Sequence, residues 1–296
     1  MKKFIHFTLL YFFVGIALVV IFDVATSALI NSKANFVLPG KPTHIVVGHS
    51  HPECAFNDSL INNFRNLGES GEAYFYTYFK TKKVLEQNPE IKTVFIDFSS
   101  NQLVDKANLN IWSEKYLMHR YVKLSPIMGL TEKKILLKNS FRAFLNSSSI
   151  IGQNRLVDIV TNDYNYSTRI GGYKQLTVSK VDSILQNTPF SEEKSKTCRL
   201  STTNIDYLIK LIQLCKKNNK QVLLIRCPVH KNYLLKQNDL VLKHVKDSLF
   251  RDIKFIDFAN YPLSNNDFAD LGHLNYRGAH KFSTWFNTNI RKIISD

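Results

Sequence analysis

The chain has 296 residues, of which 44% are hydrophobic and 21% charged, with a formal net charge of +15. This composition excludes an intrinsically disordered chain and provides enough apolar residues for a sizeable core. The basic residues are scattered in short clusters such as Lys216, Lys217 and Lys220. We therefore interpret them as a solvated surface and predict no nucleic-acid partner.

The N-terminus carries the clearest pattern of the sequence. Lys2 and Lys3 precede an uncharged run from Phe4 to Phe22, which is long enough to span a bilayer as a helix. The two lysines before the run, with no matching cluster immediately after it, place the N-terminus in the cytoplasm.

This pattern predicts two parts of the chain. Residues 1–32 form a transmembrane anchor and the start of a linker, and residues 33–296 form one domain in the periplasm or outside the cell. A cleaved signal peptide is the alternative, although the stretch VATSALINS at 24–32 offers only a weak cleavage site.

Four short apolar runs predict strands, and several are nearly continuous rather than alternating. Such runs are typical of strands buried on both faces of a parallel sheet. They are Ile45–Gly48, Val94–Phe98, Val222–Arg226 and Phe255–Phe258. Phe64–Gly68 is a further short candidate.

Helical patterns lie between these runs, at Ala55–Phe64, Tyr74–Leu85 and Ile205–Cys215. Alternating strands and helices predict an α/β fold of three layers around a parallel sheet. Residues 105–200 are rich in Asn, Ser, Tyr and Lys, and we interpret them as a partly helical insertion that caps a site.

The four cysteines lack the spacing of zinc ligands or of a disulfide framework. They are Cys54, Cys198, Cys215 and Cys227. Cys215 and Cys227 lie in apolar patterns and are predicted to be buried thiols. The sequence is also compatible with one disulfide if the domain lies outside the cytoplasm.

Polar residues follow three of the predicted strands. Ser50 follows the first, Asn101 follows the second after two serines, and His230 follows the third. Because the carboxyl ends of parallel strands form one edge, where ligands bind, we expect these residues to gather there.

The stretch His49-Ser50-His51 allows a metal interpretation, because H-x-H places two imidazoles on one side of an extended chain. It is similar to the G-H-[ST]-H element of calcineurin-like metallophosphoesterases. In that family the element follows D-x-H, G-D-x-x-D and G-N-H-[DE], none of which occurs in this chain. We therefore predict no metal and no organic cofactor.

A serine interpretation needs a base and an acceptor that orients the base. Ser50 lies where a strand turns into a helix, and Asp270 and His273 are three residues apart near the C-terminus. That spacing brings a carboxylate beside an imidazole, where it fixes the tautomer. The plain alternatives are that Ser50 and Asp270 cap helices and that Asn101 occupies a turn.

Taken in order, these residues resemble the four blocks of the SGNH/GDSL hydrolase superfamily. Gly48-His49-Ser50 stands for the first block, Gly68 or Gly71 for the second, and Asn101, with Ser100 as a substitute, for the third. Asp270-Leu271-Gly272-His273 stands for the D-x-x-H block. The resemblance covers residues 44–104 and 220–290. It implies a flavodoxin-like domain with a Ser50, His273 and Asp270 triad and an oxyanion hole that includes Gly68 or Gly71 and Asn101.

The tail HLNYRGAHKFS is similar to that of membrane-anchored relatives, the D-alanyl transfer proteins of teichoic acid and the alginate acetylation proteins. The resemblance implies an O-acyltransferase or esterase for a cell-surface carbohydrate or a small acyl ester, with an acyl donor from a membrane partner. His49 and His230 are candidates for the substrate pocket, and His230 is equally interpreted as a loop residue.

Two departures from the family pattern keep a second function open. His49 stands where the first block has Asp, and the third block lacks its Gly and its Asp. The alternative is a catalytically degenerate, membrane-tethered protein that binds or assembles glycans on the same fold.

Overall fold

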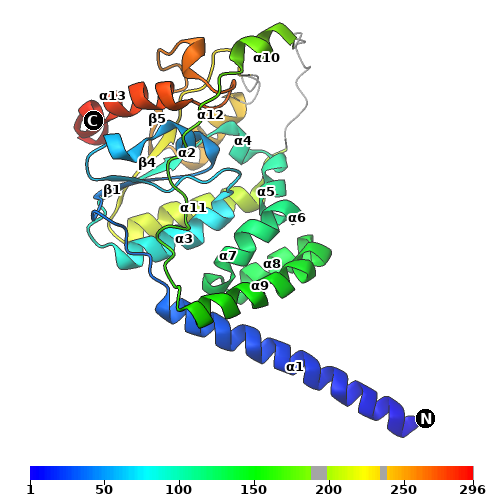
Figure 1. Ribbon diagram of the computed structural model, residues 1–296. Coiled ribbons are helices and arrows are strands. Elements are labelled where there is room, and N and C mark those ends of the chain that lie inside the picture. The colour runs from blue at the N-terminus through cyan, green and yellow to red at the C-terminus, as the bar shows by residue number, and fades with distance from the viewer. Residues whose placement is uncertain (188–198, 234–238, 296) are drawn as a thin grey trace.

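A five-stranded parallel sheet forms the centre of the protein (Figure 1). The computed structural model describes residues 1–187, 199–233 and 239–295. Its strands are β1 (His44–Val47), β2 (Phe64–Asn66), β3 (Thr93–Asp97), β4 (Gln221–Arg226) and β5 (Lys254–Asp257). The order β2-β1-β3-β4-β5 is the flavodoxin-like order, so the predicted α/β fold is confirmed.

Helices cover both faces of the sheet, because alternate strand residues point to opposite sides. Val46 and Phe95 pack in one apolar cluster with Phe282 and Phe286, whereas Ile45 belongs to the cluster on the other face. The helices on the first face are α2 (Ser50–Ala55) and α13 (Tyr276–Ser295), and those on the second are α3 (Tyr74–Gln87), α11 (Thr202–Lys217) and α12 (Asp239–Leu249).

The stretch between β3 and α11 is helical over most of its described length. Its helices are α4 (Ser100–Leu103), α5 (Leu109–Trp112), α6 (Glu114–Tyr116), α7 (Val122–Leu124), α8 (Leu130–Asn139), α9 (Phe141–Thr161) and α10 (Val181–Asn187). Residues 171–180 form neither helix nor strand. Backbone N–H groups of Gly172 and Lys174 donate to the carbonyls of Gly68 and Glu53.

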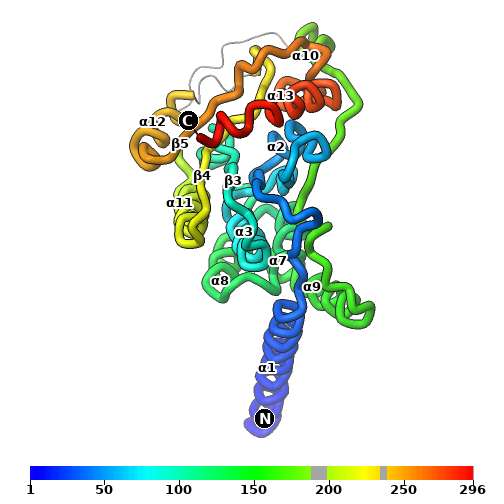
Figure 2. Tube along the Cα trace, turned by 90° about the vertical axis from the view of Figure 1, so that its left-hand side faces the viewer, coloured from blue at the N-terminus to red at the C-terminus, as the bar shows by residue number. Residues whose placement is uncertain are grey.

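The N-terminal helix α1 (Lys2–Lys33) leaves the domain as a single rod (Figures 1 and 2). Its best 18-residue window has a mean hydropathy of 2.5, and none of that window is buried. By length and composition, α1 is able to cross a membrane.

One helix prediction is wrong. A helix was expected at Ala55–Phe64, but α2 begins at Ser50 and ends at Ala55, and a short 3₁₀ turn at Asp58–Leu60 follows it. The side chain of Asn57 accepts the N–H of Ser59, which favours a turn over a continued helix. Phe64 pairs with His44 in the sheet and begins β2.

A buried ion pair supports the loop that follows β2. Lys80 and Glu72 are fully buried and contact each other, and Lys80 Nζ also donates to the carbonyls of Leu67 (2.6 Å) and Ile170 (3.1 Å). Burial raises the pKa of Glu72, and the nearby ammonium of Lys80 only partly offsets that effect. The Glu72 carbonyl accepts Gln102 Nε2 at 2.8 Å, which links this loop to the residues after β3.

We expect Lys80→Met to lower the free energy of unfolding by about 3–5 kcal/mol, because it leaves a buried carboxylate without its partner. Urea unfolding of the full chain in detergent, followed by tryptophan fluorescence, measures the loss. Lys82→Met, on the exposed side of the same helix, is the matched control. Adding Glu72→Gln to Lys80→Met should recover part of the loss, and no recovery would contradict the ion-pair explanation.

Candidate active site

Ser50, His273 and Asp270 meet at the carboxyl edge of the sheet in one hydrogen-bonded row. Ser50 Oγ lies 2.8 Å from His273 Nε2. On the far side of the ring, His273 Nδ1 lies 2.9 Å and 3.0 Å from the two carboxylate oxygens of Asp270. The fold thus brings together a hydroxyl, an imidazole and a carboxylate in the order that nucleophilic catalysis requires.

Local backbone geometry fixes the loop that carries the imidazole and the carboxylate. Asp270 Oδ1 accepts the N–H groups of Gly272 at 2.8 Å and His273 at 3.0 Å. Ala269 N–H donates to the His273 carbonyl at 2.9 Å and closes the loop. A side chain at Gly272 would meet the ring of Tyr233 at 3.0 Å, so this position requires a close backbone approach.

The charge of Asp270 sets the tautomer of His273. Burial by itself raises the pKa of Asp270, but the hydrogen bond and charge of His273, with the two backbone N–H donors, bring this pKa below its ordinary value. Asp270 is therefore an anion at neutral pH and accepts the proton on Nδ1. Nε2 is then the nitrogen that accepts the Ser50 hydroxyl proton.

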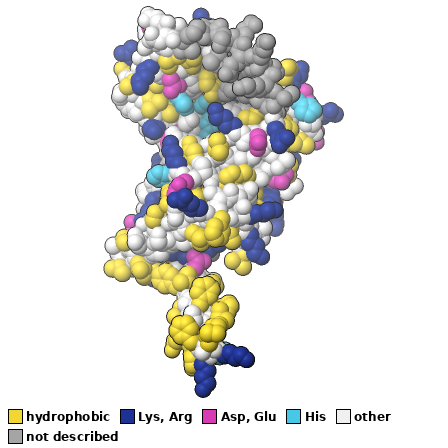
Figure 3. Space-filling view, turned by 90° about the vertical axis from the view of Figure 1, so that its right-hand side faces the viewer, with side chains coloured by type: hydrophobic (Ala, Val, Ile, Leu, Met, Phe, Trp, Pro, Cys, Tyr) yellow, Lys and Arg dark blue, Asp and Glu magenta, His cyan; other side chains and the backbone are white. Residues whose placement is uncertain are grey.

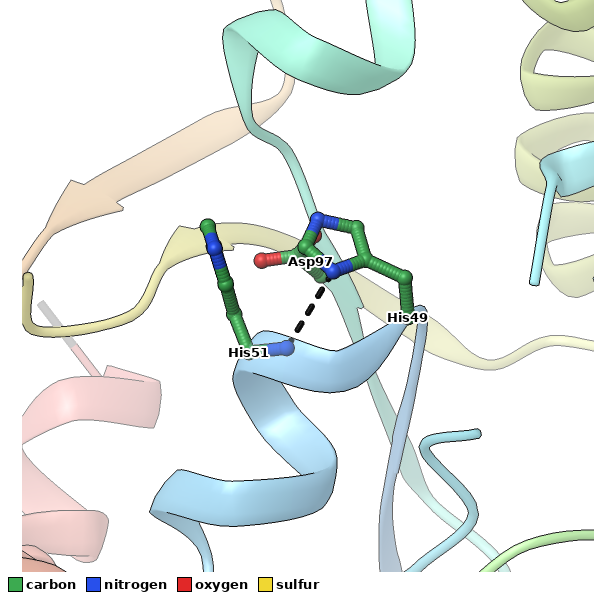
Figure 4. A group of neighbouring side chains, drawn as sticks. All are labelled: His49, His51 and Asp97. Carbon is green, nitrogen blue, oxygen red and sulfur yellow. Dashed lines mark hydrogen bonds and ion pairs between the residues drawn. The ribbon is translucent and has the colours of Figure 1, made fainter. Parts of the chain in front are cut away.

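His49 is not exposed to a pocket but buried under Ser50. Its Nδ1 accepts the backbone N–H of His51 at 3.1 Å, as Figure 4 shows, and lies 3.4 Å from Ser50 Oγ. Its Nε2 lies 3.0 Å from Asp97 Oδ2 and 2.9 Å from Ser99 Oγ. Because Nδ1 accepts, Nε2 carries the proton and donates it toward Asp97.

Ser99 extends this network to Asn101. Ser99 Oγ lies 3.0 Å from Asp97 Oδ2 and 2.7 Å from Asn101 Oδ1, and we assign its single proton to the shorter contact, with Asn101. Asn101 Oδ1 therefore accepts a hydrogen bond from Ser99, and the N–H groups of Asn101 Nδ2 have no acceptor among the described residues. The sequence places Ser99 at this edge but does not point to Asp97. The signal for Asp97 was a carboxylate at the end of an otherwise apolar strand.

His51 is buried against both other histidines. Its ring centroid lies 4.3 Å from that of His49 and 5.4 Å from that of His273, with Tyr233 at 5.8 Å on another side. Among the described residues its Nδ1 has no hydrogen-bond partner. Burial, followed by the charges of His49, His273 and Arg226, holds the pKa of His51 well below its ordinary value.

His49, His51 and Asp97 have the residue types of a metal site, and one ligand atom from each lies within 4.8 Å of the others. In the observed arrangement, however, His49 and Asp97 are hydrogen-bonded to each other, and the second nitrogen of His49 accepts a backbone N–H. We interpret the cluster as the support that holds Ser50 in place.

The two glycines proposed for the oxyanion hole differ in their surroundings. Gly68 N–H donates to Asn66 Oδ1 at 2.8 Å, so it is already used. Gly71 N–H has no hydrogen-bond acceptor in the described part of the chain, and neither does Ser50 N–H. Gly71 has a φ of +69°, and the ring of Tyr116 lies against it. The Gly68 N–H is therefore not free to bind an oxyanion, and Gly71 stays the candidate of the two.

A cavity of about 730 Å³ opens beside Asn101. Its lining includes the aromatic rings of Tyr116 and Tyr233, which also contact Gly71 and His51, so the cavity adjoins the candidate site. The rest of the lining mixes the apolar side chains of Val104, Ala107 and Leu109 with polar and charged ones, among them Lys106, Asn110, Ser113, Lys115 and Arg199. Tyr116 and Tyr233 were not found from the sequence, because neither lies in a block of the motif.

His230 lies at the same edge but in another hollow. It is buried, its Nε2 lies 3.0 Å from Asn265 Oδ1, and its Nδ1 accepts the N–H of Asn232 at 3.2 Å. Its backbone N–H donates to the Leu271 carbonyl at 2.9 Å. These bonds support the loop of Asp270 and agree with the interpretation of His230 as a loop residue.

The low pKa of His51 predicts an acid-sensitive stability. Below about pH 6.5 the unfolded chain takes up a proton on His51, whereas the folded chain does not. The free energy of unfolding therefore falls as the pH decreases below this value. We expect His51→Phe, which keeps a ring without a titrating group, to reduce the loss by up to about 1.4 kcal/mol per pH unit. Urea unfolding at a series of pH values measures it. His244→Phe, on an exposed position, is the control, and an equal effect there would refute the assignment.

Comparisons with known proteins identify no activity. No curated protein matches the chain. Among solved structures, a proposed acylhydrolase from Bacteroides fragilis is similar over 90% of this chain and 95% of its own, with 13% sequence identity and a TM-score of 0.39. A likeness this distant carries no conclusion about chemistry. A protein-family model matches residues 148–295, and its description names neither an activity nor a ligand. The chain belongs to the family that this model defines.

Proposed function

We propose that the chain is a serine-dependent enzyme of acyl-ester chemistry, an esterase or O-acyltransferase. The observation that carries the proposal is the row from Ser50 Oγ through the His273 ring to Asp270, at 2.8 Å and 2.9 Å. A serine that only capped α2 would need neither an imidazole at hydrogen-bond distance nor a carboxylate behind that imidazole. The motif resemblance points to the same reaction class.

In the proposed reaction, His273 Nε2 takes the proton of Ser50 as Oγ attacks the acyl carbonyl carbon. Asp270 stabilises the imidazolium that forms. The N–H groups of Ser50 and Gly71 and the Asn101 amide stabilise the oxyanion. The ester C–O bond then breaks, and His273 returns the proton to the leaving alcohol. A water molecule or a second alcohol, deprotonated by His273, releases the acyl group from Ser50.

The substrate we propose is an acylated carbohydrate of the cell surface. The large cavity beside Asn101 combines aromatic rings with amide, hydroxyl and ammonium groups, which suits an acceptor rich in hydroxyl groups. The helix α1 supports a membrane anchor, and the lysines at its start support an N-terminus in the cytoplasm, with the domain in the periplasm or outside. A membrane partner that supplies the acyl donor remains part of the proposal.

We expect Ser50→Ala and His273→Ala each to lower the turnover of p-nitrophenyl acetate by about 10⁴–10⁶-fold, and Asp270→Asn by about 10⁴-fold. The assay uses the full chain in detergent. Ser248→Ala, on an exposed position of α12, is the control that should keep the wild-type rate.

Retention of activity by Ser50→Ala would overturn the nucleophile assignment. A wild-type rate equal to that of buffer would contradict a small-ester hydrolase. Glycan binding by the wild type, unchanged in Ser50→Ala, would then favour the non-catalytic alternative.

The oxyanion assignment gives a separate expectation. Asn101→Ala should lower kcat by about 10²–10³-fold, because it removes one preorganised donor. Asn110→Ala removes an amide from the wall of the same cavity and should change KM far more than kcat. A rise in KM with an unchanged kcat in Asn101→Ala would show that Asn101 serves binding alone.

A further inference from the structure

The apolar run of α1 ends at the level of one helix of the domain. As a helix, the apolar run from Phe4 to Phe22 rises about 28 Å, close to the thickness of a bilayer core of about 30 Å. The boundary of the proposed anchor therefore falls at Phe22 and Asp23. At this level α9 crosses α1, because a Cβ placed on Gly152 would lie 3.7 Å from the Phe22 ring.

Ion pairs tie the two helices of the α8–α9 hairpin, residues 130–161, to this boundary. Arg155 Nη1 lies 2.8 Å from Asp23 Oδ1, and Lys133 Nζ lies 2.9 Å from Asp23 Oδ2. Arg155 Nη1 also donates to the Asp23 carbonyl at 3.0 Å. These contacts hold the hairpin at the end of the domain from which α1 emerges, as Figure 1 shows.

One face of α9 exposes large apolar side chains. Phe141, Leu145, Leu156 and Val160 are 63%, 50%, 48% and 83% exposed. Their spacings of four and eleven residues place them on one side of the helix, opposite the buried Ala143, Ser147 and Ile151. Leu130 and Leu137 of α8 add to this surface, which we call the hairpin face.

The hairpin face has the composition of a surface that lies in a membrane interface. Exposed Lys134 and Lys138 on α8 and Arg142 at the start of α9 accompany its apolar residues. Figure 3 shows hydrophobic side chains gathered at the base of the domain, where α1 emerges. Exposed apolar side chains next to basic ones are able to contact both the acyl chains and the phosphates of a lipid surface.

We propose that the hairpin face is a second membrane contact, embedded in the interface of the bilayer that α1 crosses. Its apolar side chains enter the headgroup layer by about 5–10 Å, and Lys134, Lys138 and Arg142 face lipid phosphates. The inference rests on the proposed anchor and is independent of the catalytic proposal. Its consequence is that the domain cannot rotate freely about α1, so the active site has a fixed height above the membrane.

The test places an environment-sensitive fluorophore on single cysteines of the full chain. Cys198 is replaced by Ser, whereas Cys54, Cys215 and Cys227 are buried and stay. The chain is reconstituted in vesicles of phosphatidylethanolamine and phosphatidylglycerol. The probe positions are Leu145→Cys and Val160→Cys on the hairpin face, Val19→Cys in the anchor, and Leu240→Cys, an exposed apolar residue of α12, as the matched control.

Lipids with a nitroxide near the headgroup should quench the labels at 145 and 160 several-fold more than the label at 240. Equal quenching at 145, 160 and 240 would overturn the proposal if a nitroxide deep in the acyl chains quenches the label at 19. Absence of quenching at 19 would overturn the anchor itself, and with it this inference. If the labels at 145 and 160 are shielded from the headgroup nitroxide, and this shielding disappears when the chain is diluted in lipid, the hairpin face contacts a second copy of the chain instead.

Discussion

The buried contact between His49 and Asp97 is the interaction on which the candidate site depends. It joins the end of β1 to the end of β3, and each side chain then holds a further part of the site. Through its other nitrogen, His49 accepts the His51 N–H at the start of α2, which fixes the turn of Ser50. Ser99, beside the same carboxylate, orients Asn101. Hydrogen bonds that share a buried carboxylate strengthen one another, so the contacts of His49 and Ser99 depend on Asp97 together.

A second buried pair plays the same part on the other side of the serine. Lys80 and Glu72 hold the loop between β2 and α3, and Gln102 ties that loop to α4. The three proposed oxyanion donors thus come from segments that are joined by buried polar contacts in addition to apolar packing. Apolar packing is non-directional, whereas hydrogen bonds fix orientation, so such contacts are suited to positioning a small set of N–H groups.

Strand periodicity is a local signal, and it was sufficient to place the strands of the sheet. The flavodoxin-like fold and the choice of Ser50, His273 and Asp270 came from the motif resemblance. The sequence was insufficient where several segments meet. The choice between Gly68 and Gly71 depends on the Asn66 side chain, which uses the N–H of Gly68. The helix predicted at Ala55–Phe64 does not form as such, because Phe64 pairs with His44, twenty residues earlier, in the sheet. The role of His49 needed Asp97, which is close only in the folded chain.

The motif that the sequence resembles has Asp where this chain has His49, and the position of the negative charge differs accordingly. In this chain the charge is carried by Asp97, and a neutral imidazole separates it from Ser50. Ser50 Oγ then has two nitrogens nearby, at 2.8 Å in His273 and 3.4 Å in His49. The lone pair of His49 Nδ1 is used by the His51 N–H, so His273 is the better acceptor on both distance and availability. The Ser50 hydroxyl is therefore paired with His273, and His49 acts as a neutral support beside it.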